Sequence, residues 1–86
     1  MLAVDLQADM LSNLPSRVMA PLYRVEDMSW AMVRLNPRFD IDGDAYVMAT
    51  QRIAAVPLAD IGPVVANLAC RADDITAALD FLFQGF

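Results

Sequence analysis

Closely spaced acidic residues are the first candidates for metal or acid–base chemistry. Residues 40–44 carry three aspartates around Gly43, but the later oxygen ligands and closing glutamate of a calcium loop do not follow. An Asp-Gly pair between apolar stretches is typical of a hairpin turn. Asp73 and Asp74 could form a paired-carboxylate site, yet acidic residues are also favourable in the first turn of a helix. We therefore expect a solvated hairpin and a helix start here.

The sequence lacks the residues that a nucleophilic catalytic site or a zinc site would need. The chain has no histidine and one cysteine, Cys70, so neither a Ser–His nor a Cys–His pair can be assembled and no zinc ligand set is available. No glycine-rich phosphate loop precedes a helix. Free cysteines are seldom reactive without an activating neighbour, so we expect Cys70 to be a packing or surface residue. The sequence predicts no cofactor, no metal and no enzymatic activity.

The last six residues indicate binding instead. Residues 81–86 read Phe-Leu-Phe-Gln-Gly-Phe, so an apolar helix is followed by a glycine and another aromatic ring. Chain ends normally collect small polar residues, because nothing offsets the entropy cost of ordering them. An apolar end indicates a surface that a partner covers.

Composition narrows the class of protein. With 86 residues, we expect one domain spanning residues 1–86, near the smallest size at which a core outweighs the entropy cost. Hydrophobic residues make up 58%, more than so small a monomer readily buries, so we expect a homodimer. No stretch approaches the ~20 uncharged apolar residues of a membrane span. The start also lacks the basic region of a signal peptide, which favours a cytoplasmic protein with no membrane partner.

The net charge of the chain restricts the kinds of partner that it can bind. Eleven acidic and six basic residues give a net charge of −5. Direct DNA or RNA binding is disfavoured, because phosphates repel an acidic surface. An acidic protein can still act on a nucleic-acid enzyme by contacting its protein surface, where positive charge favours the encounter.

Alternating hydrophobicity predicts several short antiparallel strands. The segments expected as strands are residues 2–7, 17–22, 28–35, 39–41, 45–50 and 53–58. The first two flank a turn-forming cluster, and Pro21 in the second requires an edge or a strand end. The fourth and fifth form the clearest hairpin, while the third alternates least regularly.

Beyond Gly62 and Pro63 the periodicity changes to that of a helix. Apolar residues recur at offsets 0, 3, 4, 7 and 11 from residue 75, and Asp73 or the residue before it can cap the helix. Residues 64–68 fit either a strand or a helical turn. The predicted fold class is mainly β with a C-terminal α-helix, as a small barrel or sheet packed on that helix.

In order and spacing, several segments resemble the CcdB family, the toxins of toxin–antitoxin modules. The matching segments are residues 4–9, 17–22, 54–58, 61–62, 65–68, 74–79 and 83–86. The resemblance implies a homodimeric SH3-like barrel of antiparallel strands with a C-terminal helix. It also implies a non-enzymatic toxin that binds the DNA gyrase A subunit, poisons gyrase and is neutralised by a CcdA-like antitoxin.

The resemblance further implies which residues bind gyrase. By position they are Met10, Leu11, Asp80, Phe83, Gln84, Gly85 and Phe86. Gln84 stands where the family has a tryptophan, and loss of such an anchor costs ~2–4 kcal/mol of binding. The family also has a strand ahead of the segment that begins at Leu2. We therefore expect an open apolar edge there, and altered antitoxin contact.

Two other functions stay open at this point. The related MazF and Kid toxins share the fold and are ribonucleases, so Arg17 or Arg52 with an aspartate could act in phosphodiester cleavage. The acidic charge and the lack of histidine argue against this function. A non-toxic or degenerate CcdB-like binding module would instead bind an antitoxin without arresting growth, as Gln84 and the open edge suggest.

Overall fold

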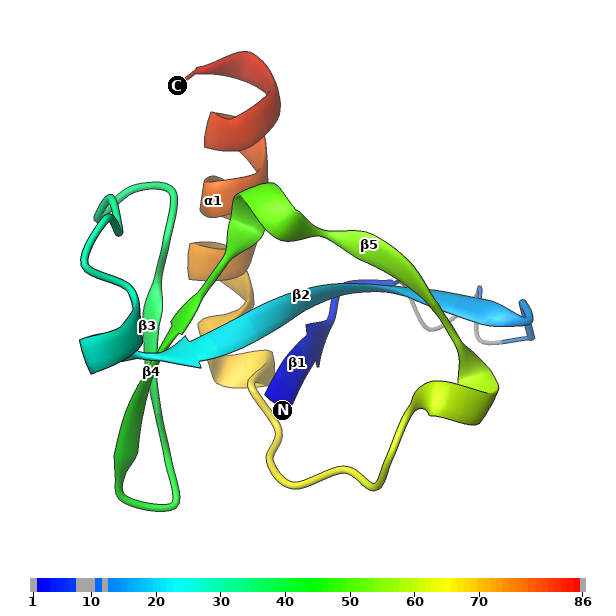
Figure 1. Ribbon diagram of the computed structural model, residues 1–86. Coiled ribbons are helices and arrows are strands. Elements are labelled where there is room, and N and C mark those ends of the chain that lie inside the picture. The colour runs from blue at the N-terminus through cyan, green and yellow to red at the C-terminus, as the bar shows by residue number, and fades with distance from the viewer. Residues whose placement is uncertain (1, 8–10, 12, 86) are drawn as a thin grey trace.

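The computed structural model describes residues 2–7, 11 and 13–85 (Figure 1). Within them, five strands form one antiparallel sheet and one α-helix follows at the C-terminal end. The elements are β1 (Leu2–Asp5), β2 (Ser16–Arg24), β3 (Arg38–Ile41), β4 (Asp44–Met48), β5 (Ala54–Pro57) and α1 (Ala72–Gln84). Short 3-10 helices occupy Val25–Asp27, Thr50–Arg52, Leu58–Asp60 and Ala69–Arg71. None of the helices in this part of the chain is long and apolar enough to cross a membrane.

The sheet is organised around β2, its longest strand. The order is β1-β2-β4-β3, and β5 pairs with the first half of β2 on the same side as β4. Figure 1 shows β2 running across the molecule, with α1 rising beside the sheet. The sheet curls into a half-barrel, so the predicted class, a small SH3-like β-barrel of antiparallel strands with a C-terminal helix, is confirmed.

The position of Pro21 differs from the expected edge or strand end. Pro21 lies inside β2, opposite Ala3 of β1. On the other side of β2, the residues up to Met19 pair with β5 and those from Leu22 onward pair with β4, so Pro21 faces the gap between those two strands. Its carbonyl accepts a hydrogen bond from the Ala49 N–H at 2.9 Å. Because the N–H and C=O of one strand residue point the same way, the missing N–H falls where no strand needs it.

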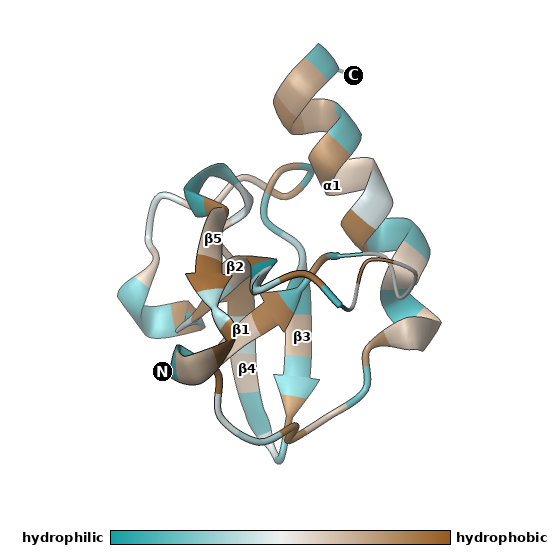
Figure 2. Cartoon of the chain, turned by 90° about the vertical axis from the view of Figure 1, so that its right-hand side faces the viewer, coloured by the Kyte–Doolittle hydropathy of each residue, from teal (hydrophilic) through white to brown (hydrophobic). Residues whose placement is uncertain are grey.

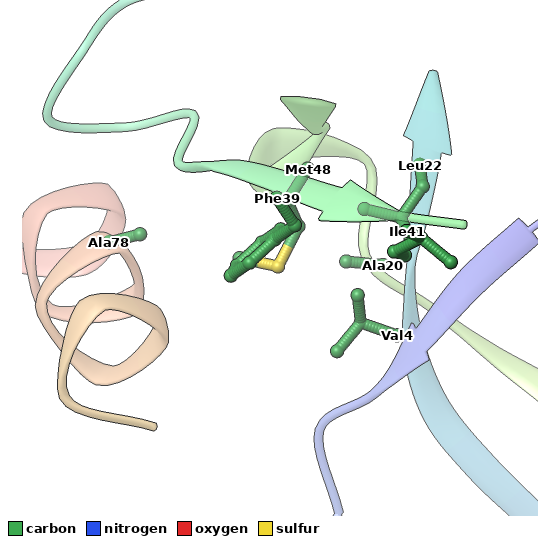
Figure 3. Packing of buried hydrophobic residues seen from close by; sticks show 7 residues of the cluster. All are labelled: Val4, Ala20, Leu22, Phe39, Ile41, Met48 and Ala78. Atoms are coloured by element: carbon green, nitrogen blue, oxygen red, sulfur yellow. The ribbon is translucent and has the colours of Figure 1, made fainter. Parts of the chain in front are cut away.

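The core lies between the concave face of the sheet and α1. Its buried members come from four strands and the helix: Val4, Ala20, Leu22, Phe39, Ile41, Met48 and Ala78. In Figure 3, Phe39 and Met48 reach from the sheet toward Ala78 on α1. Ala78 is fully buried, so the helix backbone approaches the sheet closely at this point.

The strand expected over residues 28–35 is wrong, because this segment is a loop. The side chain of buried Asn36 makes hydrogen bonds here in place of sheet pairing. Its amide nitrogen donates to the Met48 carbonyl at 3.0 Å and to the Gln51 side-chain oxygen at 2.7 Å. Its amide oxygen accepts a hydrogen bond from the Met32 N–H at 2.9 Å. The Thr50 hydroxyl donates to the Leu35 carbonyl. Residues 28–37, called the 28–37 loop below, are therefore held by two buried polar side chains.

The remaining expectations for local structure are largely met. The hairpin of β3 and β4 turns at Asp42 and Gly43, with φ of 52° and 86°, as a two-residue turn with two positive φ angles requires. Residues 64–68 form neither a strand nor a helical turn. The helix begins at Ala72, and no side chain caps it. The expected cap by Asp73 or its predecessor is therefore absent, although Asp73 lies in the first helical turn.

Candidate functional site

The C-terminal turns of α1 extend beyond the sheet. Figures 1 and 2 both show this end standing clear of the strands, and Figure 2 shows hydrophobic and hydrophilic residues mixed on it. Phe83 is 72% exposed. Asp80, Phe83 and Gln84 are spaced by three and four residues, so they share one face of the helix. An exposed aromatic ring beside a carboxylate and an amide is suited to contact with a protein surface.

Gly85 ends the helix in a defined conformation. Its φ is 78°, in the left-handed region, and its N–H donates to the Phe81 carbonyl at 2.9 Å. This geometry is common at helix C-termini, where it satisfies a carbonyl that has no partner within the helix. The structure therefore brings together four of the sequence-predicted site residues: Asp80, Phe83, Gln84 and Gly85.

Leu11, a further predicted site residue, is not part of this cluster. Leu11 is exposed and lies in the connection between β1 and β2, where the Gln7 amide donates to its carbonyl at 2.7 Å. In Figure 1, β2, which follows this connection, begins at the right of the molecule, far from the end of α1 at the top. Met10 and Phe86 lie outside the described residues.

A cleft lies between the 28–37 loop and the face of α1 from Asp74 to Asp80. Its volume is about 570 Å³, and its lining includes Val33, Arg34 and Asp80. The guanidinium carbon of Arg34 lies 4.6 Å from the centroid of the Phe81 ring, while Val33 is 94% exposed. The loop thus adds an apolar and a cationic side chain beside the predicted site.

Charged side chains of both signs line this cleft, including Asp74 and Asp80. Arg34, Arg38 and Arg71, half of the six arginines, line it. Arg71 is paired with Asp74 at 2.6 Å and lies 4.8 Å from the Phe39 ring centroid. Sequence reasoning missed this cluster because it placed residues 28–35 in a strand. The irregular alternation and Pro37 were the available signals for a loop.

The arginines considered for phosphodiester cleavage occupy different surroundings. Arg17 forms an ion pair with Asp5 at 2.7 Å, so its guanidinium already has a carboxylate partner. Arg52 donates to the Tyr23 hydroxyl at 2.8 Å and lies 5.3 Å from the Trp30 ring centroid. Among the described residues, no three Cys, Asp or Glu side chains are arranged to hold a metal ion.

Comparison with known families gives one match. The model of one family, described as CcdB protein, matches residues 1–85 of the chain. The chain belongs to the CcdB family. Because the match covers nearly the whole chain, it includes both the sheet and α1. CcdB proteins are toxins of toxin–antitoxin systems and act as gyrase poisons, so membership supports a role of this general kind and does not point to catalysis.

Proposed function

We propose that this CcdB-family chain binds the DNA gyrase A subunit through the projecting end of α1 and poisons gyrase. The observation that carries the proposal is exposed Phe83, which shares a helix face with Asp80 and Gln84. Aromatic side chains dominate the energy of protein interfaces, because they bury a large area with few rotatable bonds. The chain acts by docking, and a CcdA-like antitoxin neutralises it in the cytoplasm.

The proposal includes a homodimer that presents two helix ends to one partner. It is supported by the many large apolar side chains that are exposed in the single chain. They are Leu11, Leu14, Val18, Trp30, Met32, Val33, Leu58, Val64, Val65 and Phe83. Large exposed apolar patches mark protein–protein interaction sites, and dimerisation would cover part of this apolar surface. A dimer would also carry two copies of Leu11, a further residue that we predict to bind gyrase.

Induced expression in two hosts tests the gyrase proposal. One host carries wild-type gyrase, and the other carries a gyrase A subunit altered on its dimerisation-domain surface. We expect growth arrest only in the first host. Arrest in both hosts would contradict the proposal, and degradation of purified RNA by the protein would assign the arrest to a ribonuclease.

Phe83→Ala tests the surface itself. Loss of an interface aromatic of this kind costs about 2–4 kcal/mol, so binding should weaken by roughly 30- to 1000-fold and arrest should disappear. Thr76→Ala is the matched control, because Thr76 is exposed on the same helix but lies outside its projecting end. Circular dichroism and light scattering must show that both variants keep the fold and oligomeric state. Arrest by Phe83→Ala at unchanged protein level would contradict the proposed surface.

Gln84 supports a second candidate, a binding module that no longer poisons gyrase. Its exposed side chain lies on the same face as Asp80, where the family resemblance places a large aromatic anchor. Gln84→Trp distinguishes the two candidates. If the wild-type chain is not toxic but Gln84→Trp arrests growth in the wild-type host alone, the chain is the non-toxic module.

A further inference from the structure

Two arginines in the cleft between the 28–37 loop and α1 have no acidic partner within the described part of the chain. Eleven acidic side chains accompany six arginines, and three of these arginines form ion pairs. Arg34 and Arg38 form none with a described residue, although both are exposed and line the same cleft. Their guanidinium N–H groups are therefore available to an acceptor on a ligand.

The backbone that carries these two arginines is fixed from the inside of the molecule. Asn36, which lies between them in the sequence, is 2% exposed and donates to the Met48 carbonyl at 3.0 Å. The Pro37 carbonyl accepts a hydrogen bond from the Met48 N–H, also at 3.0 Å. Both contacts attach this segment to the last residue of β4. A fixed backbone lowers the entropy cost of bringing the two side chains to one ligand group.

α1 forms the opposite wall of the cleft. Asp74, Ala77 and Asp80 follow one another at intervals of three residues, so they lie along one side of the helix. Ala77 is exposed and carries only a methyl group, which leaves the middle of this wall hollow. The cleft volume of about 570 Å³ lies within the range of protein pockets that enclose small ligands.

The charges of the cleft restrict its ligand. Arg71 and Asp74 neutralise each other at 2.6 Å, which leaves Arg34 and Arg38 beside one further acid, Asp80. This balance favours a ligand with a single carboxylate, because Asp80 and the net charge of −5 repel additional negative charge. A nucleic-acid strand carries a phosphate at every nucleotide and is disfavoured for the same reason.

The apolar part of the lining indicates what accompanies that carboxylate. Val33 is 94% exposed on the loop side, and Pro37 lies on the same wall. Ala77 faces the cleft from α1. An apolar side chain next to the ligand's acid would remove the exposed surface of Val33 from water. A peptide segment supplies both groups on neighbouring residues.

We propose that this cleft binds a segment of another protein that carries one glutamate or aspartate with an apolar residue beside it. The carboxylate accepts hydrogen bonds from the guanidinium groups of Arg34 and Arg38, and the apolar side chain packs between Val33 and Ala77. The site goes beyond the proposed gyrase contact. Phe83 is not in its lining, so binding in the cleft is measured separately from growth arrest.

Three short peptides, capped at both ends, test the proposal with the full chain. They are acetyl-Ala-Val-Glu-Val-Ala-amide and the same peptide with glutamine or lysine in place of glutamate, so only the central side chain differs. NMR of the ¹⁵N-labelled chain follows the Nε–H signals of Arg34 and Arg38 and gives the dissociation constants. We expect the glutamate peptide to bind about 5- to 30-fold more tightly than the glutamine peptide, from two exposed ion pairs of ordinary size. The lysine peptide should not bind.

Single substitutions locate the site. Arg38→Gln removes one of the two ion pairs and should lower the preference for glutamate to about fivefold or less. Arg24→Gln changes the net charge equally at an exposed arginine outside the cleft, so the preference should stay the same. Ala77→Leu fills the hollow of the helix wall and should abolish peptide binding. Phe83→Ala should retain it, which separates this site from the gyrase contact.

Several results would overturn the proposal. They are equal binding of the three peptides, an unchanged preference in Arg38→Gln, or no shift of either arginine signal at ~10 mM peptide, where even a contact of a few kcal/mol is detected. A thymidine oligonucleotide that shifts these signals more than the glutamate peptide would assign the cleft to phosphate groups instead. Peptide binding without gyrase-dependent growth arrest would contradict the gyrase proposal alone, and arrest without peptide binding would contradict this one alone.

Discussion

The guanidinium carbon of Arg34 lies 4.6 Å from the centroid of the Phe81 ring, so the 28–37 loop holds the projecting end of α1. The contact joins an irregular segment to a helix that otherwise extends away from the sheet. The loop is itself fixed by buried Asn36, two residues after Arg34, whose amide donates to the Met48 carbonyl. The exposed face with Phe83 is therefore supported from the side, which lowers the entropy cost of presenting it to a partner.

Replacing Arg34 by glutamine should lower the free energy of unfolding by about 0.5–1 kcal/mol, the usual size of an exposed cation–π contact. Urea denaturation measures this loss, and faster amide exchange in the last turn of α1 would locate it. Arg38→Gln is the matched control, since Arg38 lines the same cleft but contacts no aromatic ring among the described residues. Equal losses in the two variants would contradict a specific role for the Phe81 contact.

Asn36→Leu should be strongly destabilising. Asn36 is 2% exposed and makes three hydrogen bonds, so its replacement leaves the buried Met48 carbonyl without this donor and removes the acceptor of the Met32 N–H. We expect a loss of about 1–3 kcal/mol in unfolding free energy. Asn13→Leu, at an exposed position, should change stability by less than about 0.5 kcal/mol. A small effect in Asn36→Leu, measured by urea denaturation, would show that the loop is held mainly by other contacts.

The contrast between the β3–β4 hairpin and the 28–37 loop shows what the sequence could predict. The hairpin depends on local chemistry, because Asp42 and Gly43 supply the positive φ angles of the turn themselves. The loop depends on Asn36 and Thr50, whose hydrogen bonds join segments distant in sequence. Hydrophobic alternation carries no information about such bonds, so a strand was predicted there.

The same distinction applies to the candidate site. The apolar face of α1 and the glycine after it follow from spacing and residue type, and both were predicted. Arg34 was not, since its contact with Phe81 depends on the path of the 28–37 loop. Pro21 is likewise tolerated because it lies between the part of β2 that pairs with β5 and the part that pairs with β4. These pairing limits are set only in the assembled sheet.

Ala78→Leu should destabilise the helix–sheet packing. Ala78 is fully buried among Phe39, Met48 and their neighbours, so three additional carbon atoms would force the helix away from the sheet. Overpacking of this kind costs about 1–3 kcal/mol. Ala77→Leu is the control, because Ala77 is exposed on the same helix and leucine is a good helix former. Thermal unfolding of both variants should separate them by several degrees, and coincident curves would show that the sheet can repack around the larger side chain.

Two glycine substitutions separate backbone conformation from steric space at the candidate site. An added Cβ at Gly85 or at Gly62 would meet no atom within 4 Å, but Gly85 alone of the two has a positive φ, of 78°. Gly85→Ala should therefore cost about 1 kcal/mol of left-handed strain or unwind the last turn of α1. Gly62→Ala should be neutral or stabilise by up to about 1 kcal/mol, since alanine lowers the entropy of the unfolded chain.

Urea denaturation gives both values, and amide exchange of Gln84 reports the last turn directly. If Gly85→Ala also weakens growth arrest while Gly62→Ala does not, the defined end of α1 contributes to function as well as to stability. Equal stability changes would mean that the left-handed geometry at residue 85 is not maintained in solution.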